Sequence, residues 1–160
     1  MKPIMLATDG SPTAEKATGT AIELAKLLDT ELIVVTAWEI PYTTVGLAPA
    51  PGASGELAKL SEEEARKVAA QAAARAEEAG VETRSSVLRG ITVQEICAAA
   101  EKFDPRFLVI GSHGWGVVKR ALFGSVSTGV LHRAACPVLV VRGDEAVTTN
   151  GVRAVEKAQA

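Results

Sequence analysis

Short runs of consecutive hydrophobic residues alternate along the chain with longer stretches in which hydrophobic residues recur every three or four positions. Continuous apolar runs are typical of strands buried in a parallel sheet, whereas the longer period is typical of a helix with one buried face. The apolar runs predict strands at residues 4–7, 32–36, 107–110 and 137–141, and a segment that alternates apolar and polar residues predicts an outer strand at 81–88. The periodic stretches predict helices at residues 12–29, 61–79, 92–103 and 125–134.

The order of these elements predicts the fold class. Strands and helices alternate from the first strand to the last, and parallel strands need crossovers that place helices on both faces of a sheet. We therefore expect an open α/β sandwich built on a five-stranded parallel sheet. We expect one domain at 1–142, with a Pro-, Gly- and Ala-rich loop at 40–55 that is either a lid or a disordered connection, and a tail at 143–160 that requires no order.

Several residues at the predicted helix starts have the side chains of helix caps. Ser11 precedes Pro12, which suits an N-cap followed by proline at the first helical position. Ser61 and Thr92 are each followed three residues later by a glutamate, which is the spacing of a capping box. The sequence therefore predicts that the second helix begins near Ser61 and that Thr92 caps the third.

Composition narrows the classes of partner. The 160 residues are 48% hydrophobic and 22% charged, and the net charge of -2 argues against a broad basic surface for nucleic acid or an anionic membrane. The N-terminal apolar run is too short for a signal peptide, and no stretch approaches the roughly 18 apolar residues of a membrane span. Cys97 and Cys136 lie in no metal-ligand pattern and suit a reducing compartment. We expect a cytoplasmic protein.

Two segments that follow predicted strands carry candidate chemistry. Asp9 follows the first strand, Gly111 and Gly114 follow the fourth, and Gly124 with Ser125 opens the last helix. Ligands of open α/β sheets bind at the carboxyl ends of strands, where a carboxylate can accept hydrogen bonds from sugar hydroxyls. Glycines there permit positive φ and close backbone approach, and amides at a helix N-terminus favour phosphate. These residues predict a polyphosphate site, although neither GxxxxGK[ST] nor GxGxxG is present.

The spacing of the small residues is more specific than their presence. Gly111 and Gly114 are separated by two residues, and nine more residues separate Gly114 from Gly124 and Ser125. This spacing resembles the nucleotide-binding signature of the universal stress protein family. The segments 4–11, 108–114 and 124–142 look like that family almost throughout, so that the resemblance covers residues 2–142. The chain is thereby identified as a member of the ATP-binding subgroup of the family.

The resemblance implies a fold and a set of site residues. It implies the strand order 3-2-1-4-5 and binding of ATP, with Mg²⁺ or Mn²⁺, between the first and fourth strands. It implies that Asp9 contacts the ribose or adenine side and that Ala37 offers backbone groups to adenine. The residues implied to line the ribose and phosphates are Gly111, His113 and Gly114, and those implied to donate amides and hydroxyls to the phosphate chain are Gly124, Ser125, Val126 and Ser127.

The resemblance also implies a mode of assembly, and the sequence differs from the family at one site position. Family members commonly form homodimers by pairing their last strands, which here run from Val138 to Val141. Trp115 stands where the family often has a basic residue, so charge neutralisation of the phosphates would rest on amides, the metal ion and either Lys119 or Arg120. Two roles for Trp115 stay open: its ring either stacks on a partner or folds back over its own loop.

Three classes of function stay open at this point. The resemblance favours an ATP-binding, nucleotide-regulated stress-response or signalling protein that acts through dimerisation and an unknown protein partner. A slow ATPase or phosphotransferase ranks second, because no general base with a supporting partner is evident, and His113 is expected to contribute its backbone. A nucleotide-free interaction or chaperone-like module ranks third. No catalytic residue is assigned, and no metal ligand is identified.

Overall fold

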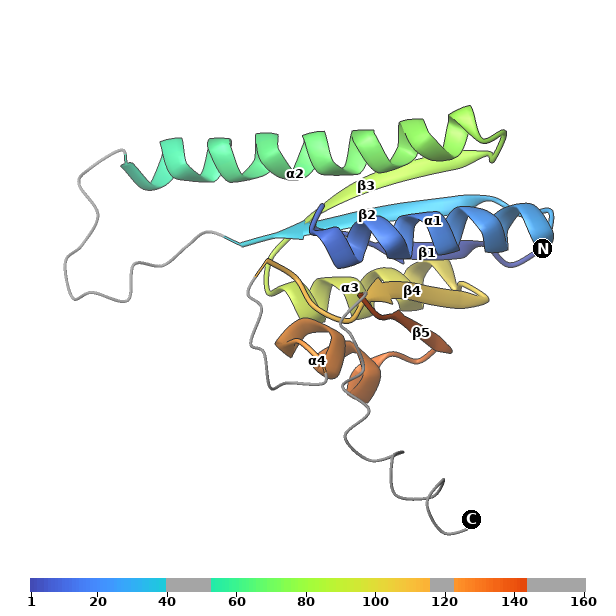
Figure 1. Ribbon diagram of the computed structural model, residues 1–160. Coiled ribbons are helices and arrows are strands. Elements are labelled where there is room, and N and C mark those ends of the chain that lie inside the picture. Colours follow the sequence, from blue (N-terminus) through green and yellow to red (C-terminus); the bar gives the residue numbers. More distant parts are fainter. Residues whose placement is uncertain (40–52, 116–122, 144–160) are drawn as a thin grey trace, which may run out of the picture.

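The chain forms a five-stranded parallel sheet in the order β3-β2-β1-β4-β5, as the computed structural model shows for residues 1–39, 53–115 and 123–143 (Figure 1). The fold class and strand order expected above are confirmed. The strands are β1 (Ile4–Ala7), β2 (Leu32–Trp38), β3 (Thr83–Arg89), β4 (Phe107–Gly111) and β5 (Val138–Val141). The helices are α1 (Pro12–Leu27), α2 (Ala53–Glu78), α3 (Thr92–Phe103) and α4 (Ser125–Arg133).

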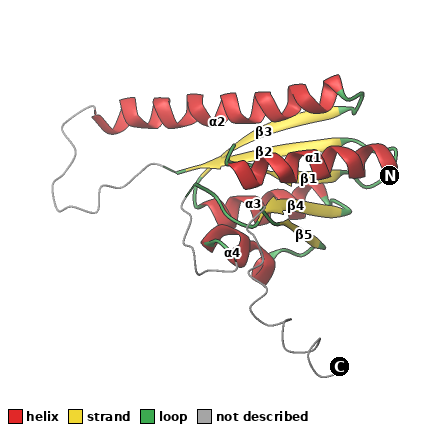
Figure 2. Cartoon of the chain, in the orientation of Figure 1, coloured by secondary structure: helices red, strands yellow, loops and turns green. Residues whose placement is uncertain are grey.

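The helices cover both faces of the sheet (Figure 2). One apolar cluster joins α1 and α2 to the sheet through side chains such as Leu6 and Val34, and a second joins α3 and α4 through side chains such as Met5 and Ile33. Consecutive strand residues thus pack into opposite clusters, because side chains alternate between the two faces of a strand. The alternation explains why both faces of the central strands are apolar, with Thr36 in β2 as a buried polar exception.

The strand β1 is the centre of the sheet and sets the position of the site. It pairs in parallel with β2 on one side, where Ala7 lies opposite Val35, and with β4 on the other, where Ala7 lies opposite Ile110. The chain order reverses between β1 and β4, since the sheet grows through β2 and β3 in one direction and through β4 and β5 in the other. Such a switch point leaves a crevice outside the carboxyl ends of the two strands.

The start of α1 is the one that the sequence predicted. Ser11 is the N-cap and its hydroxyl accepts a hydrogen bond from the Ala14 amide, while Pro12 occupies the first helical position. Proline is tolerated there because the first amides of a helix have no intrahelical acceptor. The end of α3 also follows the sequence, since the helix stops at Phe103 and Asp104 adopts a left-handed conformation before Pro105.

The predicted start of α2 was wrong, and so was the residue predicted to cap α3. The helix α2 begins at Ala53, so Ser61 lies inside it and caps nothing, and the predicted loop at 40–55 extends no further than residue 52. Residues 53–60 contain Ala, Leu, Glu and Lys, which all have high helix propensity. Thr92 is the first helical residue of α3 rather than its cap, and the N-cap residue Ile91 has no capping side chain.

The rest of the predicted loop, Lys119 and Arg120, and the tail beyond Gly143 lie outside the described residues. Among the residues that are described, no helix is both long and apolar enough to cross a membrane.

Candidate functional site

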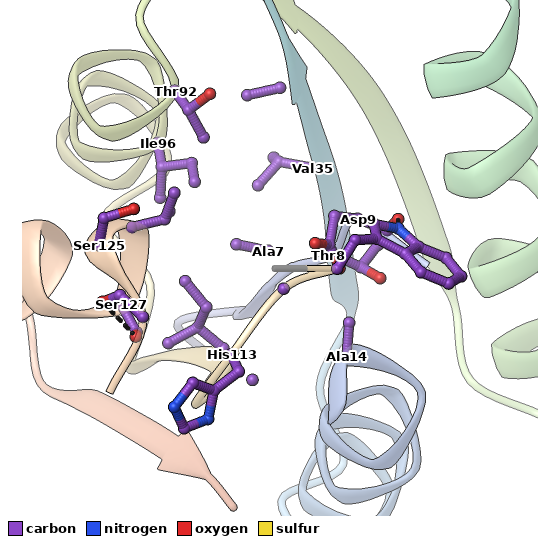
Figure 3. Close-up of a pocket in the computed structure, with 17 residues that line it drawn as sticks. Ala7, Thr8, Asp9, Ala14, Val35, Thr92, Ile96, His113, Ser125 and Ser127 are labelled. Atoms are coloured by element: carbon purple, nitrogen blue, oxygen red, sulfur yellow. Dashed lines mark hydrogen bonds between the residues drawn. The ribbon is translucent and has the colours of Figure 1, made fainter. Parts of the chain in front are cut away.

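A cavity of about 390 Å³ lies at the carboxyl ends of β1, β2 and β4 (Figure 3). Its lining combines apolar side chains, among them Val35, Ile96 and Ile110, with polar ones such as Asp9 and Ser125. All nine residues that the sequence assigned to nucleotide binding line this one cavity: Asp9, Ala37, Gly111, His113, Gly114, Gly124, Ser125, Val126 and Ser127. An apolar lining with a few polar groups is typical of sites for small molecules that carry a flat ring.

Asp9 lies on the loop after β1, and its carboxylate faces the loop after β4. The Asp9 Oδ1 atom accepts a hydrogen bond from the Ser11 amide at 3.0 Å. The other oxygen, Oδ2, lies only 2.6 Å from the position that a Cβ atom on Gly114 would occupy. The Asp9 side chain is exposed and lines the cavity, so its acceptor atoms are available to a ligand.

The two loops are joined through the main chain of His113. Its carbonyl oxygen accepts hydrogen bonds from Ser11 Oγ at 3.3 Å and from Thr13 Oγ1 at 2.7 Å. The main chain of His113 thus bonds to the start of α1, while the residue also lines the cavity. The His113 ring lies near the Ser112 hydroxyl, with 3.1 Å between Nδ1 and Oγ, but Ser112 is 2% exposed and is not among the residues that line the cavity.

The three signature glycines serve different purposes, and none has the positive φ that the sequence analysis allowed for them. A Cβ atom on Gly111 would lie 2.9 Å from the Ala14 amide nitrogen and 3.1 Å from the Thr13 carbonyl oxygen, so Gly111 lets β4 approach the backbone of α1. Gly114 leaves room for the Asp9 carboxylate. A Cβ atom on Gly124 would meet its nearest neighbour at 3.4 Å, which is ordinary contact, so the surrounding protein does not itself require a glycine there.

Three helices begin at the cavity, and they differ in what faces their first amides. The helix α1 has the Ser11 cap with the Asp9 carboxylate beside it. The helix α3 receives the Glu39 carboxylate from the end of β2, whose Oε1 accepts from the Thr92 amide at 2.6 Å and the Thr92 hydroxyl at 2.9 Å. The helix α4 has no side-chain cap at Gly124 and no acidic residue in its first turn. An unopposed helix N-terminus attracts anions, so the charge pattern favours an anion at α4.

The residues at the start of α4 divide into anchors and exposed groups. The Gly124 amide donates to the Ser112 carbonyl oxygen at 2.7 Å, and the buried Ser127 hydroxyl donates to the same oxygen at 2.8 Å. These two bonds fix the helix start on the loop after β4, so the Gly124 amide and the Ser127 hydroxyl proton are already engaged. Ser125 is exposed and Val126 is half-buried, and both line the cavity.

Sequence reasoning assigned neither Thr92 nor Glu39 to the site and left the role of Trp115 open. Thr92 and Trp115 line the cavity, and Glu39 holds Thr92 in place. Thr92 was assigned only as a cap, and Glu39 comes from an element 53 residues earlier in the chain. A pairing over that separation leaves no local pattern. The structure shows neither of the two roles left open for Trp115: its indole nitrogen donates to the Asp9 carbonyl oxygen at 3.0 Å, so the ring reaches across to the loop after β1 and does not fold back over its own loop.

Resolved pKa shifts lie away from the cavity. Burial raises the pKa of both the Cys97 and the Cys136 thiols, which keeps them protonated at neutral pH. Neither cysteine lines the cavity. Within residues 1–39, 53–115 and 123–143, no group of three His, Cys, Asp or Glu side chains has the arrangement of a metal site.

Comparisons with known proteins agree with this fold and site. The profile of the Universal stress protein family matches residues 1–142. The chain is 36% identical over 142 residues to universal stress protein MJ0531 of Methanocaldococcus jannaschii, covering 88% of this chain and 82% of that protein. The solved structure of the hypothetical protein MJ0577 superposes with a TM-score of 0.74 at 29% identity, covering 89% of this chain and 96% of that one. A universal stress protein solved in complex with cAMP gives a TM-score of 0.64 at 25% identity, with 88% and 96% covered. By its profile, its relatives and its fold, this chain belongs to the universal stress protein family.

Proposed function

We propose that this protein binds an adenine nucleotide, with ATP as the leading candidate, in the cavity between β1 and β4. The observation that carries the proposal is the uncapped start of α4, which borders a cavity whose lining also includes the apolar side chains of Val35, Ile96 and Ile110. The structure of a family member in complex with cAMP supports adenine nucleotides as the class of ligand. The spacing of Gly111, Gly114 and Gly124 supports the ATP-binding subgroup.

The cavity offers a separate place for each part of a nucleotide. The apolar side chains of Val35 and Ile96, together with the Ala37 backbone, suit the flat face and edge of adenine. The Asp9 carboxylate suits the ribose hydroxyls, because a charged acceptor makes strong hydrogen bonds to hydroxyl donors. The first amides of α4, with the Ser125 hydroxyl, suit the phosphates.

A divalent cation fits this site as a companion of the phosphates. Magnesium keeps several water ligands and is commonly held by nucleotide phosphates with one or two carboxylates. Because Asp9, the carboxylate among the described lining residues, is proposed for the ribose, phosphate oxygens and water would be the ligands of the cation. We propose that Mg²⁺ or Mn²⁺ enters with ATP and neutralises phosphate charge, while the chain itself supplies backbone amides.

We further propose that the nucleotide regulates the protein instead of being turned over rapidly. The Ser112 hydroxyl and the His113 ring are a candidate pair of nucleophile and base, but Ser112 is buried outside the cavity lining. The role proposed is that of a stress-response or signalling protein that acts through a partner protein and a homodimer. The buried or half-buried free thiols Cys97 and Cys136 suit a reducing compartment, and we propose a cytoplasmic location.

The homodimer is proposed to form through β5. This strand pairs with β4 on one side, and at the end of the described sheet its other edge has no strand neighbour. Leu139 is 37% exposed there, whereas Val138 and Val140 pack against the core. An apolar edge strand of this kind favours pairing with a second copy.

Titration calorimetry with ATP and Mg²⁺ tests the ligand. We expect the unmodified protein to bind and Gly124→Val to bind at least ten-fold more weakly, because its branched side chain stands where the phosphates approach the first amides of α4. Circular dichroism should find Gly124→Val folded, since its Cβ meets only ordinary contacts. Leu27→Ala, at an 80% exposed position on α1 outside the cavity lining, serves as the control and should bind as the unmodified protein does. Equal binding by Gly124→Val would contradict the assigned phosphate position, and no binding of ATP, AMP or cAMP by the unmodified protein would contradict the function.

A further inference from the structure

Trp115 has an unusual combination of exposure and bonding. It follows Gly114 directly and lines the cavity, yet 72% of its surface is exposed. A tryptophan stabilises a protein mainly through the area that it buries, so packing explains little of why this ring is placed here. The indole N–H, in contrast, has a partner.

That partner belongs to the other loop of the switch point. The Trp115 Nε1 atom donates to the Asp9 carbonyl oxygen at 3.0 Å, which ties the loop after β4 to the loop after β1. The two residues are separated by 106 positions in the chain. The bond therefore fixes the main chain of Asp9 from across the cavity mouth.

One oxygen of the Asp9 side chain is held by a hydrogen bond, and the other lies where the absence of a side chain on Gly114 leaves room. The Oδ1 atom accepts from the Ser11 amide, and Oδ2 occupies the space that a side chain on Gly114 would fill. Its orientation thus depends on the position of its own backbone relative to Ser11 and Gly114. A hydrogen bond that holds this backbone also holds the carboxylate.

We infer that Trp115 is a positioning residue that acts through Asp9, its indole N–H holding the Asp9 carboxylate in place for the ribose hydroxyls of the nucleotide. The inference rests on the proposed function and adds a residue to it. The exposed ring places the N–H donor within hydrogen-bond distance of the Asp9 carbonyl oxygen. Replacing the donor should therefore loosen one contact to the ligand without disturbing the core.

A double-mutant cycle tests the inference, with ATP and Mg²⁺ as the probe in titration calorimetry. Trp115→Phe keeps an aromatic ring and removes the N–H donor, and Asp9→Ala removes the carboxylate. We expect Trp115→Phe to weaken ATP binding by roughly two- to ten-fold, as the loss of one hydrogen bond does. We expect it to have no further effect in the Asp9→Ala background, because nothing is then left to position. The melting temperature of Trp115→Phe should match that of the unmodified protein, since the ring is exposed.

Two outcomes overturn the inference while the proposed function stands. One is ATP binding by Trp115→Phe that equals binding by the unmodified protein. The other is an equal loss in both backgrounds, which would mean that Trp115 contacts the ligand independently of Asp9. Failure of the unmodified protein to bind ATP would instead overturn the function and the inference together.

Discussion

At the scale of single residues, the cavity gives each signature glycine a different physical reason for being small. Gly111 approaches the backbone of α1, Gly114 makes room for a carboxylate, and Gly124 has ordinary surroundings that leave its small size to be explained by a ligand. One glycine motif therefore combines a packing constraint, a constraint within the site, and a position that suits the proposed phosphates.

Replacing Gly111 by alanine should destabilise the fold. Its Cβ would lie 2.9 to 3.1 Å from backbone atoms of Thr13 and Ala14, which cannot move without displacing the start of α1. We expect a loss of about 1 to 3 kcal/mol in the free energy of unfolding, the range for overpacked interiors. Urea denaturation monitored by circular dichroism measures it.

Gly19→Ala is the matched control. Gly19 lies inside α1, and a Cβ there has no neighbour within 4 Å. Alanine in an open helical position should raise stability by about 0.5 to 1 kcal/mol. A Gly111→Ala protein as stable as the unmodified one would mean that β4 and α1 have more room than the structure gives them.

The sequence predicted which residues gather at the site but not how they contact one another. The positions after the strands pointed to Asp9 and to the glycines, and the family resemblance supplied the rest of the nine lining residues assigned in advance. The bond from Trp115 to Asp9 and the capping of Thr92 by Glu39 join positions far apart in the chain. Such contacts depend on tertiary geometry and leave no periodic or local signal.

At the scale of elements, α3 depends on a neighbour for its cap. Ile91 has no capping side chain, and the Glu39 carboxylate accepts hydrogen bonds from both the amide and the hydroxyl of Thr92. A carboxylate at this position also interacts favourably with the helix dipole. The end of β2 thereby stabilises the start of α3 and holds the adenine side of the proposed site.

Replacing Glu39 by alanine should destabilise the protein by about 1 kcal/mol, which is the usual value of an N-cap. Urea denaturation measures the loss. The stability of Glu39→Gln should lie between that of Glu39→Ala and that of the unmodified protein, because glutamine keeps an acceptor and loses the charge. Glu23→Ala, at an exposed position inside α1, should change stability by less than about 0.5 kcal/mol. An unchanged stability for Glu39→Ala would show that water caps α3 equally well.

The helix starts were also where sequence reasoning was least successful. Ser61 and Thr92 both have a glutamate three residues later, yet one lies within α2 and the other is already helical. A capping box is one of several ways to satisfy the first amides, and propensity or a distant carboxylate can replace it. Ser11 was predicted correctly because the following proline excludes most alternatives.

At the scale of the whole molecule, alternation of strands and helices was enough to predict the fold class, since parallel strands restrict the possible connections. The strand order came from the family resemblance, and the sheet has it. The remaining question at this scale is how two chains meet.

The proposed dimer predicts that Leu139→Lys is monomeric. A charged side chain at an exposed edge position opposes pairing with a second sheet, and lysine is common on edges that stay unpaired. Analytical ultracentrifugation of the unmodified protein should find a dimer and that of the variant a monomer. Leu131→Lys, at a 41% exposed position on α4, tests whether any added charge has the same effect. A dimer that persists in Leu139→Lys would place the interface on another surface.

The carboxylates at the helix starts have a consequence for the direction of binding. Asp9 lies at the start of α1 and Glu39 at the start of α3, so α4 is left as the cavity-facing helix start without a negative side chain. A molecule with its negative charge at one end has a single favourable direction in such a cavity. A molecule with anionic groups at both ends, such as a dinucleotide or a stretch of single-stranded nucleic acid, brings its second group close to a carboxylate. The positions of two acidic residues thus give the cavity a polarity that selects against such ligands before any contact to a base is made.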